Sequence, residues 1–353
     1  MTEKIHGQEP INREPELSKL TSTFHHGRRL RKKPLRAAGG GKQLNARTHR
    51  VLIDGSVRNP LNLSTAGLRS DFPQHEIVCA LQCAGSRRHD MRTVVREVQG
   101  IDDILEKAGV AEINEPEHFH VAFASFQVEC QEDSWYGASI PLSRALDPEK
   151  EVILALERNG KPLSVRHGYP ARIITPGLAG DRAVKWLDRI TVQKEESPNH
   201  YMRRDYKVLP PQAVDGESAE KYWGMTPAVQ EMPVNSVIVS PRTGETVTRD
   251  SDGRVACYGY ALPSGDGGPV VRVEISTDKG YTWTEAELER HDGEGRWTWK
   301  FWKAKVVLDQ GKPGSIVSKA TDASGQTQPA VPNWNLRGVC YNGYGEAREL
   351  EVK

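Results

Sequence analysis

The sequence is poor in cysteine and carries almost no net charge, and each shortage excludes a class of protein. Its 353 residues include five cysteines, at positions 79, 83, 130, 257 and 340, an odd number without a Cys-x-x-Cys pair. This usage is typical of a reducing compartment and argues against a disulfide framework or a zinc knuckle. The 48 basic and 47 acidic residues leave a formal charge of +1, which argues against a general nucleic-acid or membrane-surface binder.

Long apolar runs are missing as well. No stretch of the sequence approaches the length of a membrane-spanning helix, and the first residues, Met1 to His6, do not resemble a secretory signal. The C-terminal Glu351-Val352-Lys353 is not the Ser-Lys-Leu peroxisomal address. We therefore expect an intracellular protein, cytoplasmic or mitochondrial, with neither membrane nor nucleic acid among its partners.

The length predicts two domains, because one core seldom supports a chain of this size. Residues 1–45 are polar, with a basic run at 25–36 followed by three glycines at 39–41. Such a segment cannot bury enough apolar surface to order itself, so we expect it to be disordered. The basic run suits either a nuclear-localisation or nucleic-acid patch or a solvated linker, and the balanced charge of the remainder favours the linker.

Two further regions differ in pattern. Residues 46–213 alternate short apolar runs with turn clusters and a few helical stretches such as 103–109, which predicts a mixed α+β domain. Residues 214–232 form a polar connector. From residue 233 to residue 353 the hydrophobic period becomes two, with several short strands and glycine-rich turns, which predicts a β-sandwich.

The sandwich region contains a clear hairpin pattern. Val271, Val273 and Ile275 alternate with polar residues, and a turn at 278–280 follows. Further on, Trp297, Trp299 and Phe301 are predicted to share one face of a strand, opposite Trp302 and two polar residues. So many aromatic residues suit a carbohydrate-binding module or, as we favour, packing in a core or a subunit interface.

One short segment carries the chemistry. Leu81-Gln82-Cys83-Ala84-Gly85-Ser86-Arg87-Arg88 places a cysteine before two arginines, after a run (Val78 to Leu81) that reads as a buried strand. The small residues after Cys83 allow a sharp turn and a close approach of the backbone to a bound group. Taken alone, Cys83 could be an inert buried thiol. The arginines favour a thiolate metal ligand that faces an anion.

The segment resembles the molybdenum-ligand motif of the sulfite oxidase family, Leu-Gln-Cys-Ala-Gly-Asn-Arg-Arg, with Ser86 in place of the asparagine. Other segments match that family in the same order, so from about residue 46 to the C-terminus the chain is identified as a member. These segments begin at Trp135 (Trp-Tyr-Gly-Ala-Ser-Ile-Pro-Leu), His167 (His-Gly-Tyr-Pro-Ala-Arg), Val184 (Val-Lys-Trp-Leu), Glu195 (Glu-Glu-Ser), Arg203 (Arg-Arg-Asp-Tyr-Lys) and Trp334 (Trp-Asn-Leu-Arg-Gly-Val).

The resemblance implies a fold and a cofactor. The fold is a mixed α+β molybdenum-cofactor domain followed by an immunoglobulin-like domain that forms a homodimer. The cofactor is molybdenum bound to molybdopterin, with Cys83 as the protein's metal ligand. His167, Arg172 and Lys185 occupy the family's pterin-binding positions, where cations suit a phosphate tail.

The resemblance also implies a reaction, the oxidation of sulfite to sulfate by oxo transfer at the cysteine-ligated molybdenum. Arg88 and Arg337 are the candidate ligands of the sulfite anion, and Tyr206 is the candidate hydrogen-bond donor of the active site. We expect a haem-free form, as in the plant-type enzymes that use dioxygen. The alternative within the superfamily is a nitrate-reductase-like molybdenum domain.

Two departures from the family pattern weaken the expectation of activity. A Phe-x-x-Arg-Asn-His segment, whose Arg and His contact substrate and pterin in the family, has no counterpart here. A loop with a Trp-x-Gly element is also missing after Asp102, and no tryptophan precedes Trp135. The chain is therefore either a defective gene model or splice variant of an enzyme, or a catalytically dead homologue kept as a dimeric interaction protein.

Overall fold

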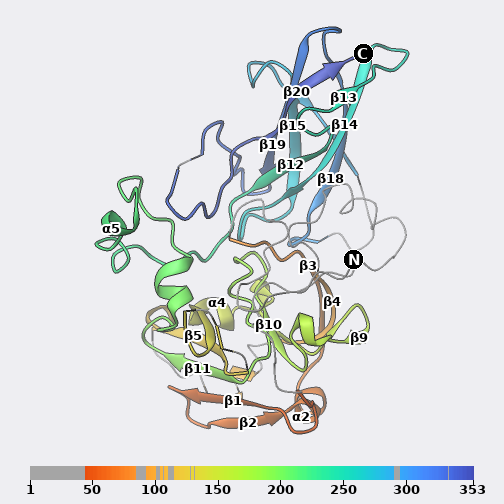
Figure 1. Ribbon diagram of the computed structural model, residues 1–353. Coiled ribbons are helices and arrows are strands. Elements are labelled where there is room, and N and C mark those ends of the chain that lie inside the picture. The colour runs from red at the N-terminus through yellow and green to blue at the C-terminus, as the bar shows by residue number, and fades with distance from the viewer. Residues whose placement is uncertain are drawn as a thin grey trace, which may run out of the picture.

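Two bodies of β-structure make up the described part of this computed structural model (Figure 1). It describes residues 44–84, 93–100 (backbone only), 104–105, 107–109, 115–127, 129–130, 132–289, 295–332 and 334–353. The lower body in Figure 1 is N-terminal, and the upper body, coloured cyan to blue, is C-terminal. No helix within these ranges is long and apolar enough to cross a membrane.

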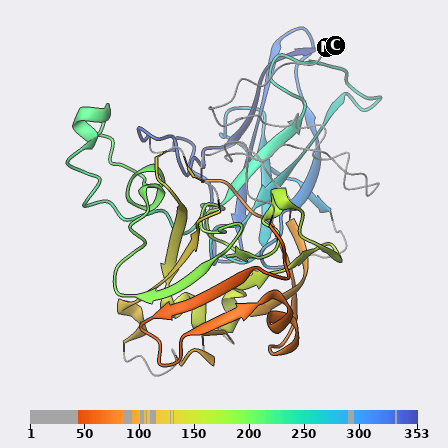
Figure 2. The same cartoon turned by 60° about the horizontal axis from the view of Figure 1, so that its bottom comes forward.

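The N-terminal body contains a mixed five-stranded sheet. Figure 2 brings it forward, with β1 and β2 in front. Strands β1 and β11 run parallel, whereas every other neighbouring pair of this sheet runs antiparallel. In spatial order the strands are β2 (Leu61–Ser64), β1 (Arg50–Gly55), β11 (Arg189–Gln193), β5 (His120–Ser125) and β6 (Tyr136–Pro141).

A second sheet and short helices complete this body. The four strands, in spatial order, are β10 (Arg172–Ile174), β7 (Ile153–Ala155), β4 (Thr93–Gly100) and β3 (His75–Cys79). A hairpin, β8 (Glu157–Arg158) with β9 (Lys161–Pro162), stands beside them. The short helical segments are α2 (Thr65–Ser70), η2 (Pro116–His118), α4 (Leu142–Leu146), η3 (Pro148–Lys150) and η4 (Val165–His167). The expected α+β mixture is present, although its helices are single turns rather than long covering helices.

The main core of the N-terminal body lies between these elements. Ile53, Phe123 and Ile140, from three strands of the five-stranded sheet, are completely buried, and Leu68 from α2 joins them. Burial of each such side chain contributes about 1.5–3 kcal/mol to the free energy of folding, relative to leaving the side chain exposed. Of the helix predicted at 103–109, residues 104, 105 and 107 are helical and residues 108 and 109 form a turn; residues 103 and 106 lie outside the described residues.

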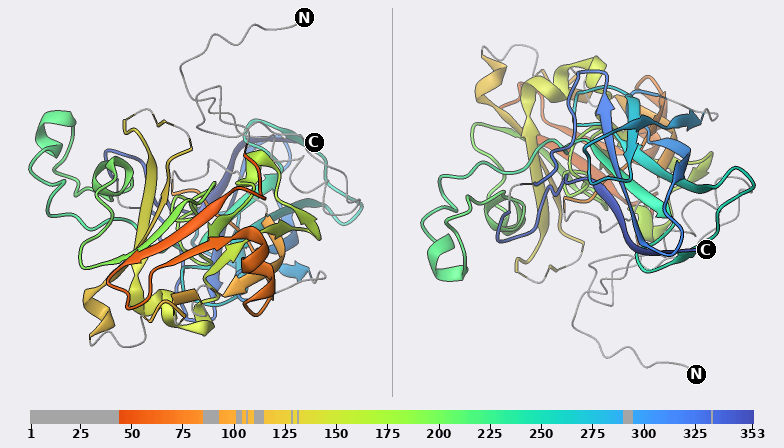
Figure 3. Two further views of the ribbon diagram at one scale, coloured as in Figure 1. Left: turned by 90° about the horizontal axis from the view of Figure 1, so that it is seen from below. Right: turned by 90° about the horizontal axis from the view of Figure 1, so that it is seen from above.

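The C-terminal body consists of two packed sheets with a separate core. One sheet has the order β12 (Asn235–Ser240), β14 (Arg254–Leu262), β18 (Lys300–Val307), β17 (Glu287–Glu289). The other has the order β13 (Thr246–Val247), β20 (Gly345–Val352), β19 (Pro313–Asp322), β15 (Val270–Ser276), β16 (Thr284–Glu285). Trp302 from the first sheet and Ile316 from the second are buried in the same cluster, so the two sheets enclose one core. The short helix α5 (Gly216–Ala219) projects to one side of the molecule (Figure 3), whereas the end of the connector, with Val229 and Met232, is buried.

The predicted hairpin is confirmed, but one of its side chains was placed on the wrong face. Strand β15 pairs with β16 through Glu274–Glu285 and Ile275–Thr284, and the turn between them carries Lys279 and Gly280 at positive φ. A register shift between Val270 and Arg272 interrupts the alternation. Val270 is therefore buried and Val271 is 51% exposed, because a bulge moves the following residues to the opposite face.

The tryptophan-rich strand also differs from its prediction. Trp302, predicted to lie on the polar face, is 1% exposed and packs in the sandwich core. Trp299 and Phe301 lie in another cluster, together with Ala80 of the N-terminal body. Both faces of this sheet are covered, one by the second sheet and one by the other body, so simple in-out alternation fails. The burial of these rings supports packing over carbohydrate binding.

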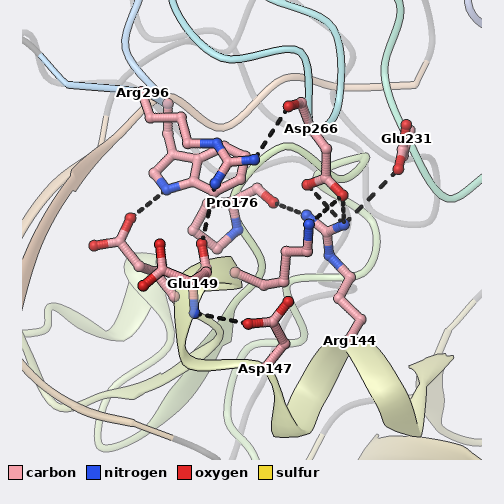
Figure 4. Close-up of polar contacts among 10 residues, drawn as sticks. Arg144, Asp147, Glu149, Pro176, Glu231, Asp266 and Arg296 are labelled. Atoms are coloured by element: carbon pink, nitrogen blue, oxygen red, sulfur yellow. Dashed lines mark hydrogen bonds and ion pairs between the residues drawn. The ribbon is translucent and has the colours of Figure 1, made fainter.

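Charged side chains hold the two bodies together (Figure 4). Arg144 of α4 is 9% exposed and lies 3.0 Å from Asp266 of the C-terminal body; it also donates to the carbonyl of Pro176 at 2.8 Å. From the other side, Arg296 donates to the carbonyl oxygens of Asp266 (3.1 Å) and Glu149 (3.4 Å). These contacts of Arg144 and Arg296 therefore join the two bodies.

Candidate active site where the two bodies meet

The segment that carries Cys83 is an irregular extension of β3. The strand predicted for residues 78–81 ends at Cys79, and beyond it Gln82 forms a parallel bridge with Ala179. The amide of Gly180 donates to the Gln82 carbonyl at 2.7 Å, and a Cβ at Gly180 would lie 3.1 Å from that oxygen. Glycine therefore lets the two chains approach closely beside Cys83.

Burial distinguishes Cys83 from its neighbouring cysteines. The side chain of Cys83 is exposed, whereas the next residue, Ala84, is completely buried. Burial raises the pKa of Cys79 to about 12 and that of Cys340, aided by Asp181, to about 12. A metal ligand must be a thiolate. Cys79, which is buried, and Cys340, which is partly buried, are thus poorer ligands than Cys83, whose side chain is exposed to a bound group.

Residues distant in sequence surround Ala84. The amide of Cys340 donates to the Ala84 carbonyl at 2.8 Å. Ala84 also shares a hydrophobic cluster with Val339 and Val229, against which Tyr206 packs. The structure therefore brings together the Cys83 segment and Tyr206 with a loop of the C-terminal body.

Tyr206 follows directly on a π-helix, η5 (Tyr201–Asp205). Its amide donates to the Tyr201 carbonyl at 3.3 Å, and its own carbonyl accepts from the Val229 amide at 2.8 Å. The side chain is half-buried. Such π-helical turns occur frequently at functional sites, and here the turn presents Tyr206 at the junction of the two bodies.

Arg337 reaches the same place from the C-terminal body. Its loop is closed by Asn335, whose side chain accepts from the Val339 amide (3.0 Å) and donates to the Val339 carbonyl (2.9 Å). Arg337 Nη2 lies 2.9 Å from Asp205 Oδ1, so the guanidinium stands next to the Tyr206 segment. Arg88, the other predicted anion ligand, lies outside the described residues.

The three predicted pterin ligands form a second, basic group. Arg172 is 6% exposed and donates to the carbonyls of His167 (3.1 Å) and Ala183 (3.0 Å). Arg172 and Lys185 are paired in an antiparallel bridge. His167 Nδ1 lies 2.7 Å from Ser164 Oγ. The segment that follows Gly180 therefore runs from the Cys83 site to this basic group.

The electrostatics of the basic group fit an anionic cofactor. Burial and four cations lower the pKa of His167 to about 4; the cations are Arg158, Arg172, Lys185 and Arg166. Burial and the charge of Arg158 lower the pKa of Arg172 to about 10. Cations that disfavour one another's charge are stabilised by a bound anion. A phosphate-bearing pterin would supply that anion, so the residues present fit the group that the sequence implies.

Several residues at the junction were not predicted. Asp205 and Asn335 lie within matched motifs, but only the structure shows that one pairs with Arg337 and the other closes its loop. Asp181 and Arg182 precede the Val184 motif, and nothing in the sequence marks their side chains as 3% and 1% exposed. Among the residues described, no group of three or more His, Cys, Asp or Glu side chains gathers to hold a metal ion.

Comparison with protein families assigns both halves of the chain. Residues 38–201 match the oxidoreductase molybdopterin binding domain, and residues 226–347 match the Mo-co oxidoreductase dimerisation domain. The fold is similar to that of the sulfane dehydrogenase SoxCD from Paracoccus pantotrophus. The TM-score is 0.66 at 23% identity, with 89% of this chain and 80% of that chain covered.

Sequence relatives agree with these matches. The mitochondrial sulfite oxidase of Homo sapiens is 40% identical over 97% of this chain, which spans 64% of the human protein. The sulfite oxidase of Arabidopsis thaliana is 33% identical, with 95% of this chain and 91% of the plant protein covered. The NADH nitrate reductase of Ulva prolifera is 32% identical over 95% of this chain and 41% of its own length. A plant relative matched along nearly its whole length, together with both domain matches, places this chain in the sulfite oxidase family.

Proposed function

We propose that this chain is a molybdenum–pterin oxidoreductase that oxidises sulfite to sulfate, with Cys83 as the protein ligand of the metal. The observation that carries the proposal is the convergence of the Cys83 segment, Tyr206 and Arg337 at one junction, where the Cys340 amide meets the Ala84 carbonyl at 2.8 Å. Three motifs far apart in sequence meet where a small anion would have to bind.

The roles of the residues follow from their chemistry. Sulfite and water give sulfate, two protons and two electrons, so the site must bind an oxyanion and hold it in place. Arg337, held by Asp205, would supply positive charge, and Arg88, which lies outside the described residues, would supply a second positive charge. The Tyr206 hydroxyl donates a hydrogen bond to an oxygen of the anion. When bound, the molybdenum–pterin group supplies oxygen-atom transfer and accepts the two electrons.

The pterin would be held by His167, Arg172 and Lys185. Each of the three side-chain nitrogens of Arg172 donates to a backbone carbonyl, so the N–H groups that remain on Nη1 and Nη2 are preorganised for a phosphate. Lys185 would act as a point charge. The segment 180–185 runs from this basic group to the Cys83 site, where Cys83 would hold the metal.

The domain organisation forms part of the proposal. Residues 46–213 would form the cofactor domain and 214–232 the connector, and residues 233–353 would form an immunoglobulin-like domain that makes a two-fold homodimer. The match to a dimerisation domain supports the dimer. Sedimentation of the full chain tests it: we expect twice the 39.3 kDa of one chain, and a monomer at micromolar concentration would contradict it.

An intracellular location, cytoplasmic or mitochondrial, also belongs to the proposal. The human relative carries the word mitochondrial in its name, which supports the second compartment.

The decisive experiment measures metal content and substrate preference together. The purified full chain is analysed for molybdenum and pterin, and its rates of sulfite oxidation and nitrate reduction are compared. Stoichiometric cofactor with sulfite as the faster substrate supports the proposal. Faster nitrate reduction would favour the nitrate-reductase-like alternative, which the Ulva relative supports. Absence of both molybdenum and pterin would favour the dead homologue.

A further inference from the structure

A buried ion pair lies behind Tyr206 and takes no part in the roles assigned above. Arg182 Nη1 lies 2.7 Å from Asp181 Oδ2, and the two side chains are 1% and 3% exposed. Burying two charges costs several kcal/mol per ion, and apolar side chains of similar volume often stabilise a core more. Stability alone is thus a weak reason for this pair.

The guanidinium of Arg182 holds two segments that flank Tyr206. Its Nε donates to the Val229 carbonyl at 2.9 Å, and Nη2 donates to the same oxygen. Its Nη1 donates to Met202 Sδ, in the π-helix that directly precedes Tyr206. The amide of Val229 in turn donates to the Tyr206 carbonyl at 2.8 Å. The guanidinium carbon also lies 6.0 Å from the centre of the Tyr206 ring.

The backbone of the same segment holds the Cys83 side of the junction. Two residues before Arg182, the Gly180 amide donates to the Gln82 carbonyl at 2.7 Å. The neighbouring Ala179 amide donates to the Gln230 carbonyl at 2.8 Å. The four-residue stretch Ala179 to Arg182 therefore contacts Gln82, the residue before Cys83. It also contacts the two segments next to Tyr206, the one that contains Val229 and the π-helix that contains Met202.

Asp181 is the ion-pair partner of the arginine. Among the described residues its carboxylate oxygens accept no hydrogen bond, so its contact there is the ion pair with Arg182. The backbone of Asp181 is fixed separately, because the Tyr136 hydroxyl donates to its carbonyl at 2.9 Å. The carboxylate thus compensates the buried charge of Arg182, while the contacts to Val229 and Met202 fix the direction of the guanidinium.

We propose that Arg182, paired with Asp181, is a positioning residue that sets the place of Tyr206 relative to Cys83. The proposal rests on the proposed function for the role of Tyr206, but the physical link it describes exists without cofactor or substrate. It can therefore be tested in two independent ways.

The first test is amide hydrogen exchange on the full chain without cofactor. Arg182→Met removes the hold on the Val229 carbonyl, so the amides of Val229 and Tyr206 should exchange about tenfold faster or more, while those of β14 and β19 keep their rates. Arg182→Lys retains the charge but not the two hydrogen bonds to the Val229 carbonyl, so its exchange rates at Val229 and Tyr206 should lie between those of wild type and Arg182→Met. Unchanged exchange at Val229 and Tyr206 in both variants would overturn the proposal, whatever the protein catalyses.

The second test is a double-mutant cycle on the loaded enzyme. Misplacement of a reacting group by about 1 Å costs on the order of a hundredfold in rate, so Arg182→Met should lower kcat/KM for sulfite about 10- to 100-fold. In a Tyr206→Phe background the same change should cost less than about twofold, because the hydroxyl it positions is gone. Equal losses in the two backgrounds would mean a general structural role and would contradict the proposal.

Arg144 provides the matched control. It is also a buried arginine, 9% exposed, that pairs with an aspartate and donates to a backbone carbonyl, but its partners lie at the interface in Figure 4 rather than at Tyr206. Arg144→Met should change kcat/KM by the same factor with or without the Tyr206 hydroxyl. If the loaded wild type does not oxidise sulfite, the proposed function fails, and hydrogen exchange alone decides the role of Arg182. If Arg182→Met does not fold, Arg182→Lys takes its place in both tests.

Discussion

Arg337 Nη2 and Asp205 Oδ1 lie 2.9 Å apart, and this ion pair joins the two bodies beside Tyr206. The arginine side chain is 40% exposed and the aspartate side chain 14%. His200 Nε2 lies 3.7 Å from the same carboxylate oxygen. Asp205 thus holds Arg337 in place before a substrate arrives, and an incoming oxyanion must share the guanidinium with it.

Arg337→Met should therefore weaken the use of sulfite. Loss of one charge-assisted contact to a bound anion costs about 2–5 kcal/mol when the pair is buried. Because Arg337 is partly exposed, we expect the lower end, about a 10- to 100-fold decrease in kcat/KM. Steady-state kinetics measures it. Arg348→Met, which removes an exposed arginine paired with Glu346 in the same body, is the control and should leave kcat/KM unchanged; equal effects of the two variants would remove Arg337 from the site.

Cys83→Ser should abolish turnover and leave the fold intact. A hydroxyl is a harder and far less acidic donor than a thiol, so it replaces a thiolate ligand poorly. Part of the molybdenum should remain bound through the pterin contacts. Metal analysis, circular dichroism and sulfite kinetics are measured on the same preparation. Cys130→Ser, at another partly exposed cysteine, should behave as wild type, and a fully loaded, fully active Cys83→Ser protein would refute the ligand assignment.

The low pKa of His167 predicts a pH-dependent stability of the cofactor-free protein. Folding lowers the pKa of this histidine from 6.5 to about 4, so the unfolded chain binds the proton more readily. The stability that His167 contributes is complete above about pH 6.5 and is lost as the pH falls through about 4. Because the side chain is exposed, solvent screening makes the effect small.

The test compares wild type with His167→Gln in urea unfolding at pH 7.5 and pH 4.5. Wild type should lose more stability between these values than the variant does, and the difference should shrink when the pterin cofactor supplies a compensating anion. The same loss in both proteins would mean that the nearby cations do not act on His167.

The fold could be predicted where local pattern and tertiary environment agree. The hairpin of β15 and β16 was recognised because a turn sequence separates two alternating segments. Val271 and Trp302 were misplaced because a bulge and a sheet covered on both faces each break the relation between alternation and burial. Such features depend on the neighbouring elements, which single-strand periodicity does not describe.

Some residues of the candidate site could likewise be predicted from the sequence, and others could not. Cys83, Tyr206 and Arg337 were found through motifs, and the structure places their segments together. Arg182 could not be found, because its role comes from contacts with Val229 and Met202, which belong to other segments. A positioning residue has no chemical signature of its own in sequence, whereas a metal ligand flanked by arginines does.

The missing family segments lead to the last prediction. The alignment with the human enzyme runs over 367 positions but includes only 97% of the 353 residues of this chain, so some positions of the human enzyme within the matched region have no residue here. In the family pattern, the Phe-x-x-Arg-Asn-His segment carries a further arginine that contacts the substrate, in addition to the positions of Arg88 and Arg337. We expect the present chain to use sulfite tens- to thousands-fold less efficiently than a version with the Phe-x-x-Arg-Asn-His segment and the Trp-x-Gly loop restored, since one buried charge-assisted contact is worth about 2–5 kcal/mol. Kinetics on the two proteins, each corrected for its molybdenum content, measures the difference, and equal catalytic efficiency would show that Arg88 and Arg337 suffice.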